Sequence, residues 1–278
     1  NILLMIVLSL MFLLPYWLII SASFTDEMSL MINGYQFFPK DFSLYAYEYI
    51  FRSNNLMVLA IWNSIKMTVL GCIITTATCM LFAYPLSKSY LYGKKFFTWY
   101  ILITMLFSGG TVPYFLVVSS MFDDSMWAII LPGAMSAWNA ILIKNFYLTI
   151  PSTLEEAAKV DGANDFVIFL RIYFPVSFPI MATIILFSAV GIWNNWFGPM
   201  LFITSREKYP IQYLIQQLMS DINNIHMGGN IPGGDNELVP AESIKMASVV
   251  LGSLPIIMVY PFLQKYFING IIMGSVKE

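Results

Sequence analysis

The sequence predicts an all-α membrane protein whose single domain, residues 1–278, crosses the bilayer six times. Hydrophobic residues make up 58% of the chain and charged residues only 11%, whereas a soluble domain usually has about 25% charged residues. Six stretches reach the roughly 20 mostly apolar residues that a helix needs to span a membrane. Because so few charges could cover a water-exposed surface, these stretches belong in lipid. The net charge of −2 gives no basic field for nucleic acid.

The six predicted spans are distributed along the whole chain. The first apolar run already includes Asn1, so we expect a short N-terminal tail to precede it. The fifth span contains Gly191, Gly198 and Pro199, which are tolerated at membrane depth where neighbours or a cavity satisfy the freed backbone groups. We place the spans at residues 2–22, 61–87, 96–119, 127–147, 176–203 and 244–266.

Lysine and arginine predict that both termini face the cytoplasm, because cytoplasmic loops carry more of these residues than outer loops. Lys66 and Lys245 lie near outer helix ends and weaken the contrast. This orientation leaves three long loops whose function must be explained: two outer loops, at 23–60 and 204–243, and one inner loop, at 150–175. The inner side holds Lys88, Lys94, Lys95, Lys144, Lys159, Arg171, Lys265 and Lys277, and the outer loops hold Lys40, Arg52, Arg206 and Lys208.

The inner loop at 150–175 predicts two short helices joined by a sharp turn. Ser152 and Glu155 have the spacing of a capping box, which starts a helix. Gly162 follows where helices often stop, and Asn164 can cap a second helix that runs through Ile172. Such a pair is either a docking surface for another protein or an amphipathic connector on the membrane, and amphipathicity alone does not separate the two.

This loop resembles the EAA loop of binding-protein-dependent ABC importer permeases. Glu156-Ala157-Ala158 is followed after three residues by Gly162 and later by Phe174-Pro175, with Phe174 where the family usually has leucine. The rest of the chain is similar to the MalG-like permeases of carbohydrate uptake family one, in their complex-oligosaccharide subgroup. That similarity is carried by Leu14-Pro15, Ser23-Phe24, Asn63-Ser64, Phe107–Gly110, Pro113-Tyr114, Trp193–Pro199 and Gln264–Lys277.

The resemblance implies the type I ABC importer permease fold with a cytoplasmic coupling helix, in the bacterial cytoplasmic membrane. It implies a heterodimer with a second homologous permease, two ATPase subunits and an extracytoplasmic sugar-binding protein. ATP and Mg would be used by the ATPase, and this chain would bind no cofactor or metal; its sequence has no GxxxxGK[ST] loop to hold phosphates. The implied ATPase-coupling residues are Glu155, Glu156, Ala157, Ala158, Asp161, Gly162 and Ala163.

An oligosaccharide would pass residues that offer amides and aromatic faces. Trp193, Asn194, Asn195 and Trp196 supply both on one irregular span, although they can equally pack helices or relieve a kink. Lys66 lies about one helical turn inside the outer end of its span. It either snorkels to the interface or contacts an anionic substrate.

The outer loop at 204–243 is expected to begin with a short surface helix and, as in the resembling permeases, to meet the binding protein. The candidate contacts are Tyr209, Gln212, Gly228 and Gly229, although residues 224–237 could instead be a disordered tether. Two alternatives for function stay open. One is a permease of the same class for a non-sugar solute, and the other is an intramembrane sensor or enzyme, for which the sequence offers no HExxH or GxSxG motif.

Overall fold

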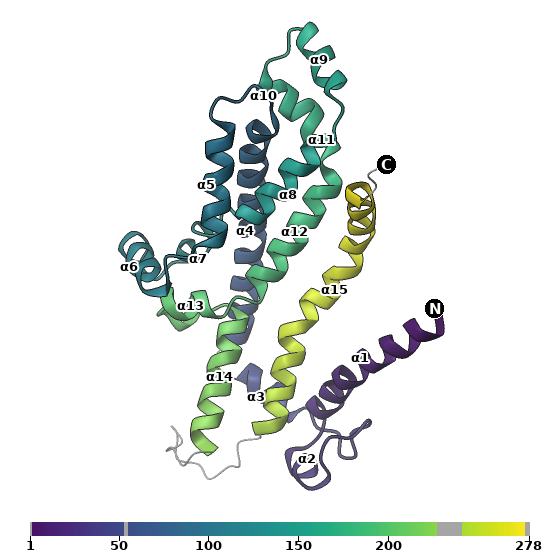
Figure 1. The fold of residues 1–278 in the computed structure, drawn as a ribbon. Coiled ribbons are helices and arrows are strands. Elements are labelled where there is room, and N and C mark those ends of the chain that lie inside the picture. Colours follow the sequence, from purple (N-terminus) through teal and green to yellow (C-terminus); the bar gives the residue numbers. More distant parts are fainter. Residues whose placement is uncertain (1, 53–54, 227–240, 276–278) are drawn as a thin grey trace. The chain divides into compact units, whose positions relative to one another are not determined.

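The computed structural model describes residues 2–52, 55–226 and 241–275, and it is helical almost throughout (Figure 1). Among these residues the only pairing of extended backbone is an isolated antiparallel bridge between Thr25 and Phe42. The prediction of an all-α protein is therefore confirmed.

The described chain divides into two compact units. Unit 1 consists of residues 1–64 and 205–257, and unit 2 of residues 65–204 and 258–278. Each unit is described by itself.

Unit 1 contains the first helix and much of the two predicted outer loops. Along α1, apolar side chains from Ile2 to Leu14 are largely exposed, as suits a lipid-facing span. The Glu27 carboxylate accepts hydrogen bonds from the backbone N–H groups of Glu242 (3.0 Å) and Ser243 (2.9 Å) and thereby caps the first turn of α15. The elements are α1 (Ile2–Ser23), α2 (Glu27–Asn33), α3 (Tyr45–Arg52), the start of α4 (Leu56–Ser87), η2 (Arg206–Lys208), α14 (Ile211–His226) and the start of α15 (Ala241–Ser275).

Unit 2 contains the core that positions the inner loop. Buried aromatic rings of Tyr84, Tyr147, Phe169 and Tyr173 meet edge to face at one end of the unit, with centroids 5.0–6.4 Å apart. Its elements are the rest of α4, α5 (Lys94–Leu106), α6 (Thr111–Met121), α7 (Trp127–Ile130), α8 (Ala137–Tyr147), α9 (Ser152–Val160), α10 (Asp165–Ile168), η1 (Phe169–Tyr173), α11 (Phe174–Val176), α12 (Phe178–Trp193), α13 (Phe197–Phe202) and the end of α15.

Several predicted spans are interrupted. Within the described residues, α1, α4 and residues 242–259 of α15 are each long and apolar enough to cross a membrane. Two bent helix pairs can add one span each, namely α5 with α6, bent by 110°, and residues 165–176 with α12, bent by 76°. The predicted span at 96–119 breaks between Leu106 and Thr111, where Gly110 has a φ of +87° that favours glycine.

The predicted spans at 127–147 and 176–203 are not single helices either. The first divides into α7 and α8 around Pro132 and Gly133, because proline lacks the N–H that a continuing helix needs. The second ends at Trp193 and resumes in α13, whereas Gly191 lies inside the regular helix α12.

The described parts of both outer loops contain helices, and most of the possible tether at 224–237 lies outside the described residues. Residues 23–60 hold α2, α3 and the first residues of α4, and residues 204–243 hold the 16-residue helix α14. The expectation of a surface helix is wrong in part, because Ile211, Tyr213 and Ile215 of α14 are buried in unit 1.

Candidate functional site

The inner-loop helix α9 ends as the sequence predicted but begins differently. Gly162 has a φ of +80°, its N–H donates to the Lys159 carbonyl (3.0 Å), and the Ala163 N–H donates to the Ala158 carbonyl (2.9 Å). The capping-box prediction is wrong, because Ser152 is the first helical residue and makes no side-chain cap. The carboxylate of Glu155 turns instead to Lys88, directly after the end of α4, since an ammonium is a stronger partner than a backbone N–H.

The second predicted helix of the loop is present but irregular. Asn164 caps it as predicted, accepting a hydrogen bond from the Val167 N–H at 2.9 Å. After α10 the chain widens into the π-helical turn η1, and α11 follows before α12 begins. Single π-helical turns often mark functional positions. Here the turn carries Tyr173, whose hydroxyl faces Glu155.

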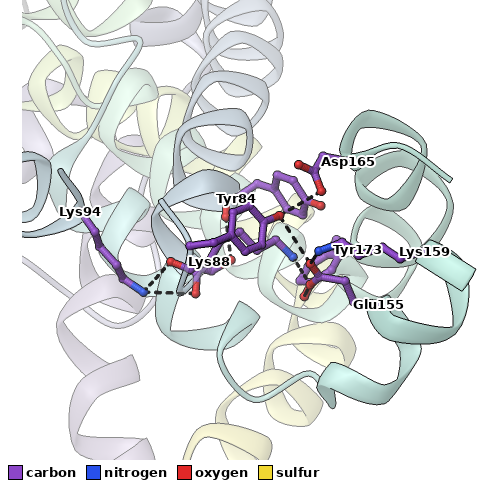
Figure 2. A network of polar contacts seen from close by, with 9 residues as sticks. Tyr84, Lys88, Lys94, Glu155, Lys159, Asp165 and Tyr173 are labelled. Atoms are coloured by element: carbon purple, nitrogen blue, oxygen red, sulfur yellow. Dashed lines mark hydrogen bonds and ion pairs between the residues drawn. The ribbon is translucent and has the colours of Figure 1, made fainter. Parts of the chain in front are cut away.

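Glu155 is the centre of a polar network that ties α9 to the end of α4 (Figure 2). Its carboxylate forms an ion pair with Lys88, whose side chain is only 5% exposed. It also pairs with Lys159, one turn further along α9, at 2.7 Å, and accepts a hydrogen bond from the Tyr173 hydroxyl at 3.0 Å. Three different elements therefore converge on one carboxylate.

Aromatic rings surround the cation of this network. The Lys88 ammonium lies 4.2 Å from the centroid of the Tyr84 ring and 3.9 Å from that of Tyr173. Tyr90 donates from its hydroxyl to Asp165 (2.9 Å), and its ring faces the Lys159 ammonium at 4.5 Å. The network thus extends from α4 through the loop after it to both α9 and α10 (Figure 2).

The charges in the network perturb one another. Burial by itself raises the pKa of Glu155, but hydrogen bonds from Lys159, Lys88 and Tyr173 outweigh it and hold the pKa at about 2. Burial lowers the pKa of Lys88, although the Glu155 carboxylate opposes that shift. Three donors therefore keep Glu155 ionised.

The predicted coupling residues occupy two faces of α9 and the turn after it. The inner face consists of Glu155, Ala158 and Ala163, which lie toward the core of unit 2. The two alanines pack against that core. The remaining residues are exposed, and Val160 beside them is 88% exposed. The outer face therefore combines small side chains, two acids and an uncovered apolar residue. Its predicted members are Glu156, Ala157, Asp161 and Gly162.

Sequence reasoning missed most of the network. Lys88 counted only as a charge that indicates membrane orientation, and Tyr90, Asp165 and Tyr173 were not singled out. Lys88 follows directly after the end of α4, so no helix-face spacing pairs it with Tyr84. The partner Glu155 lies 67 residues away in sequence, which no local pattern connects to Lys88.

The predicted substrate-path residues do not form one surface. Trp193 is buried at 6% exposure, whereas Trp196 is 41% exposed and meets Phe197 edge to face. Asn194 is exposed, and the Asn195 side chain accepts a hydrogen bond from the Gly198 N–H at 2.9 Å, which relieves the break before α13.

The remaining predicted residues lie elsewhere. Lys66 is half-buried on α4 in unit 2. Tyr209 is 7% exposed and meets Tyr213 edge to face with centroids 4.5 Å apart, and Gln212 donates to the Gly252 carbonyl at 3.4 Å. Both side chains therefore make contacts within unit 1, to which they belong. The predicted contacts Gly228 and Gly229 lie outside the described residues.

The whole chain is similar to known transport proteins. It is 41% identical over 265 residues to the polygalacturonan/rhamnogalacturonan transport system permease protein YtcP of Bacillus subtilis (strain 168), covering 95% of this chain and 92% of that protein. It is also 41% identical over 267 residues to protein LplC of the same organism, covering 95% and 89%.

A solved structure is similar over the same length. A chain in the crystal structure of a bacterial ABC transporter involved in the import of the acidic polysaccharide alginate matches with a TM-score of 0.82 and 30% identity, covering 96% of this chain and 95% of that one. Residues 1–272 match the family described as binding-protein-dependent transport system inner membrane component. The chain therefore belongs to the family of binding-protein-dependent transport system inner membrane components.

Proposed function

We propose that the chain is the transmembrane permease subunit of an ATP-driven ABC importer that takes up an oligosaccharide delivered by an extracytoplasmic binding protein. The observation that carries this proposal is α9, an EAA-type helix whose outer face is uncovered while Glu155 fixes its inner face to unit 2. The names of relatives support a sugar cargo, because they include a permease for polygalacturonan or rhamnogalacturonan and, at 26% identity, one for arabinooligosaccharides.

The proposed machinery has further parts. The chain pairs with a second homologous permease, and two ATPase subunits that use ATP and Mg dock on the α9 surfaces. It lies in the bacterial cytoplasmic membrane with both termini inside. When the ATPase moves α9, the bond from Glu155 to Lys88 passes that movement to α4, and the bond to Tyr173 passes it to η1 and α11. Without these bonds, α9 would be joined to the rest of unit 2 only through its two ends, and its movement would not be passed on to the membrane-spanning helices.

The substrate-path assignment remains a proposal. Trp196 and Asn194 are exposed and can face a sugar, whereas buried Trp193 and the cap Asn195 can act by shaping the break between α12 and α13. Uptake and ATPase activity of the four alanine variants test this. Alanine at Trp196 or Asn194 should lower uptake without lowering the ATPase response to the loaded binding protein. Wild-type uptake in all four variants contradicts a role in the path.

The coupling proposal is tested by Glu156→Lys in a complex reconstituted with its ATPase and binding protein. Glu156 is exposed on the outer face of α9, so charge reversal disturbs docking without disturbing the fold. We expect normal membrane insertion and loss of the ATPase response to the loaded binding protein. Lys95→Glu, a charge reversal at another exposed position, is the control and should retain that response. A normal response in Glu156→Lys contradicts the proposal.

A further inference from the structure

We infer that a pocket in unit 2, lined by both polar and apolar residues and away from the coupling network, is a subsite for one neutral sugar ring on the import path. This inference rests on the proposed function and names residues that the family resemblance did not supply. The pocket has a volume of about 270 Å³. It is lined by Thr75 of α4, Gly133 and Ser136 of the connection between α7 and α8, Asn139 of α8, and Ser188 and Gly191 of α12.

The pocket places polar groups where a membrane protein normally avoids them. Thr75 is 5% exposed and Asn139 is 7% exposed, yet both line the pocket together with the unwound backbone around Gly133. Irregular backbone at membrane depth is tolerated where it is buried in protein or lines a cavity. The break between α7 and α8, which the sequence did not predict, is therefore explained if this connection faces a polar occupant.

One polar atom of the pocket lacks a hydrogen-bond partner. The Ser188 hydroxyl oxygen is buried and has no hydrogen-bond partner in the protein. Buried polar groups are usually paired, and an occupant that can hydrogen-bond would satisfy this atom. Hydroxyl groups of a sugar supply both donors and acceptors, which Ser, Thr and Asn side chains can meet in either sense.

The shape and charge of the pocket limit further which class of ligand it can bind. An added Cβ at Gly191 would meet no atom within 4 Å, so the missing side chain leaves room on the α12 side. Phe187, Ile129 and Ile192 add apolar lining that suits the C–H faces of a sugar ring. No charged side chain is among the lining residues, and a buried carboxylate without a counter-charge is costly. The volume is at the small end of ligand pockets, which suits one neutral ring rather than a whole oligosaccharide.

The test uses the complete complex in proteoliposomes and two ways of spoiling the pocket. Gly191→Leu fills it without a backbone clash, and the double change Thr75→Val with Ser188→Ala removes two hydroxyls at nearly constant volume. The matched controls are Thr76→Val, whose hydroxyl is buried on the same helix outside the pocket lining, and Val190→Leu, which adds bulk beside Gly191. The measurements are uptake of labelled oligosaccharide, labelled sugar retained when the ATPase is trapped with vanadate, and the ATPase response to the loaded binding protein.

We expect both pocket variants to lose about tenfold in uptake and in retained sugar, while the ATPase response stays within about twofold of wild type. Both controls should behave as wild type. Wild-type uptake and retention in Gly191→Leu overturn the subsite, and so does an equal loss in the controls. A failure of the proposed function looks different, because the wild-type complex would then import no oligosaccharide at all. If Gly191→Leu lowers uptake but the double variant Thr75→Val with Ser188→Ala does not, recognition of a sugar by these hydroxyls is overturned. The pocket would then only limit the space through which the cargo passes.

Discussion

At the scale of single residues, Glu155 is the side chain on which the coupling loop depends. A carboxylate at 12% exposure is costly unless it is paired, and Lys88, Lys159 and Tyr173 together supply three donors. Removing one of the buried partners should therefore destabilise the loop by more than an exposed salt bridge is worth, because the remaining charge is left incompletely paired.

The first prediction concerns Lys88→Met, which keeps much of the side-chain volume but removes the ammonium. We expect unit 2 to lose about 1–3 kcal/mol of stability, the usual cost of an unsatisfied buried group, and the complex to lose much of its ATPase response. Lys95→Met removes an exposed lysine nearby and should change neither. Thermal unfolding of the purified permease measures the first effect. Equal unfolding temperatures for the two variants contradict it.

The second prediction concerns pH. The pKa of Glu155 is about 2 in the folded protein, below its ordinary value of 4.5, so ionised Glu155 stabilises the fold. This contribution is complete above pH 4.5 and is lost as the pH falls from there toward 2. Amide hydrogen exchange of α9, corrected for intrinsic rates, should therefore be constant from about pH 8 to about pH 5 and increase below. Glu155→Gln has no carboxyl to titrate, so that increase should be absent from it.

At the scale of elements, the turn after α9 fixes the direction in which the coupling helix points. Gly162 has a φ of +80°, and an added Cβ there would meet no atom within 4 Å. A side chain at this position therefore strains the backbone but clashes with no neighbouring atom. A substitution here tests the backbone geometry of the turn without changing the packing around it.

The third prediction follows from that strain. Gly162→Ala should destabilise the turn by about 1–2 kcal/mol, the price of a left-handed conformation, and lower the ATPase response while the protein still inserts. Gly162→Pro should abolish transport, because proline cannot adopt a positive φ. Gly109→Ala is the control, since it has open space around its Cβ and no positive φ. A full response in Gly162→Ala contradicts the prediction.

The same elements show how far the sequence could predict the structure. Gly162 and Asn164 were predicted because caps and stops depend on neighbours within four residues. The ion pair between Glu155 and Lys88 was not, because it joins distant parts of the chain. Apolar length located the membrane segments, but it does not say where a helix breaks, so the division around Pro132 was missed. The buried face of α14 had a usable signal in the spacing of Ile211 and Ile215.

At the scale of the whole molecule, the number of membrane crossings depends on the bent pair of α5 and α6. The pair α5 and α6 is bent by 110°, so it is either one broken span or a loop that returns to the side it came from. The positive-inside rule favours a crossing. Lys94 and Lys95 begin α5 with two positive charges, whereas Asp123 and Asp124 after α6 have no basic neighbour.

The last prediction decides between these topologies with two cysteines in unit 2. Lys95 and Asp123 are exposed at the two ends of the bent pair, and the native Cys72 and Cys79 are buried, so their background reaction is low. In intact cells we expect Asp123→Cys to react with a membrane-impermeant maleimide and Lys95→Cys to react only after permeabilisation. A returning loop would give both positions the same response, because its ends share one side. Reaction of Lys95→Cys alone in intact cells would invert the orientation, and α9 would then face away from any cytoplasmic ATPase.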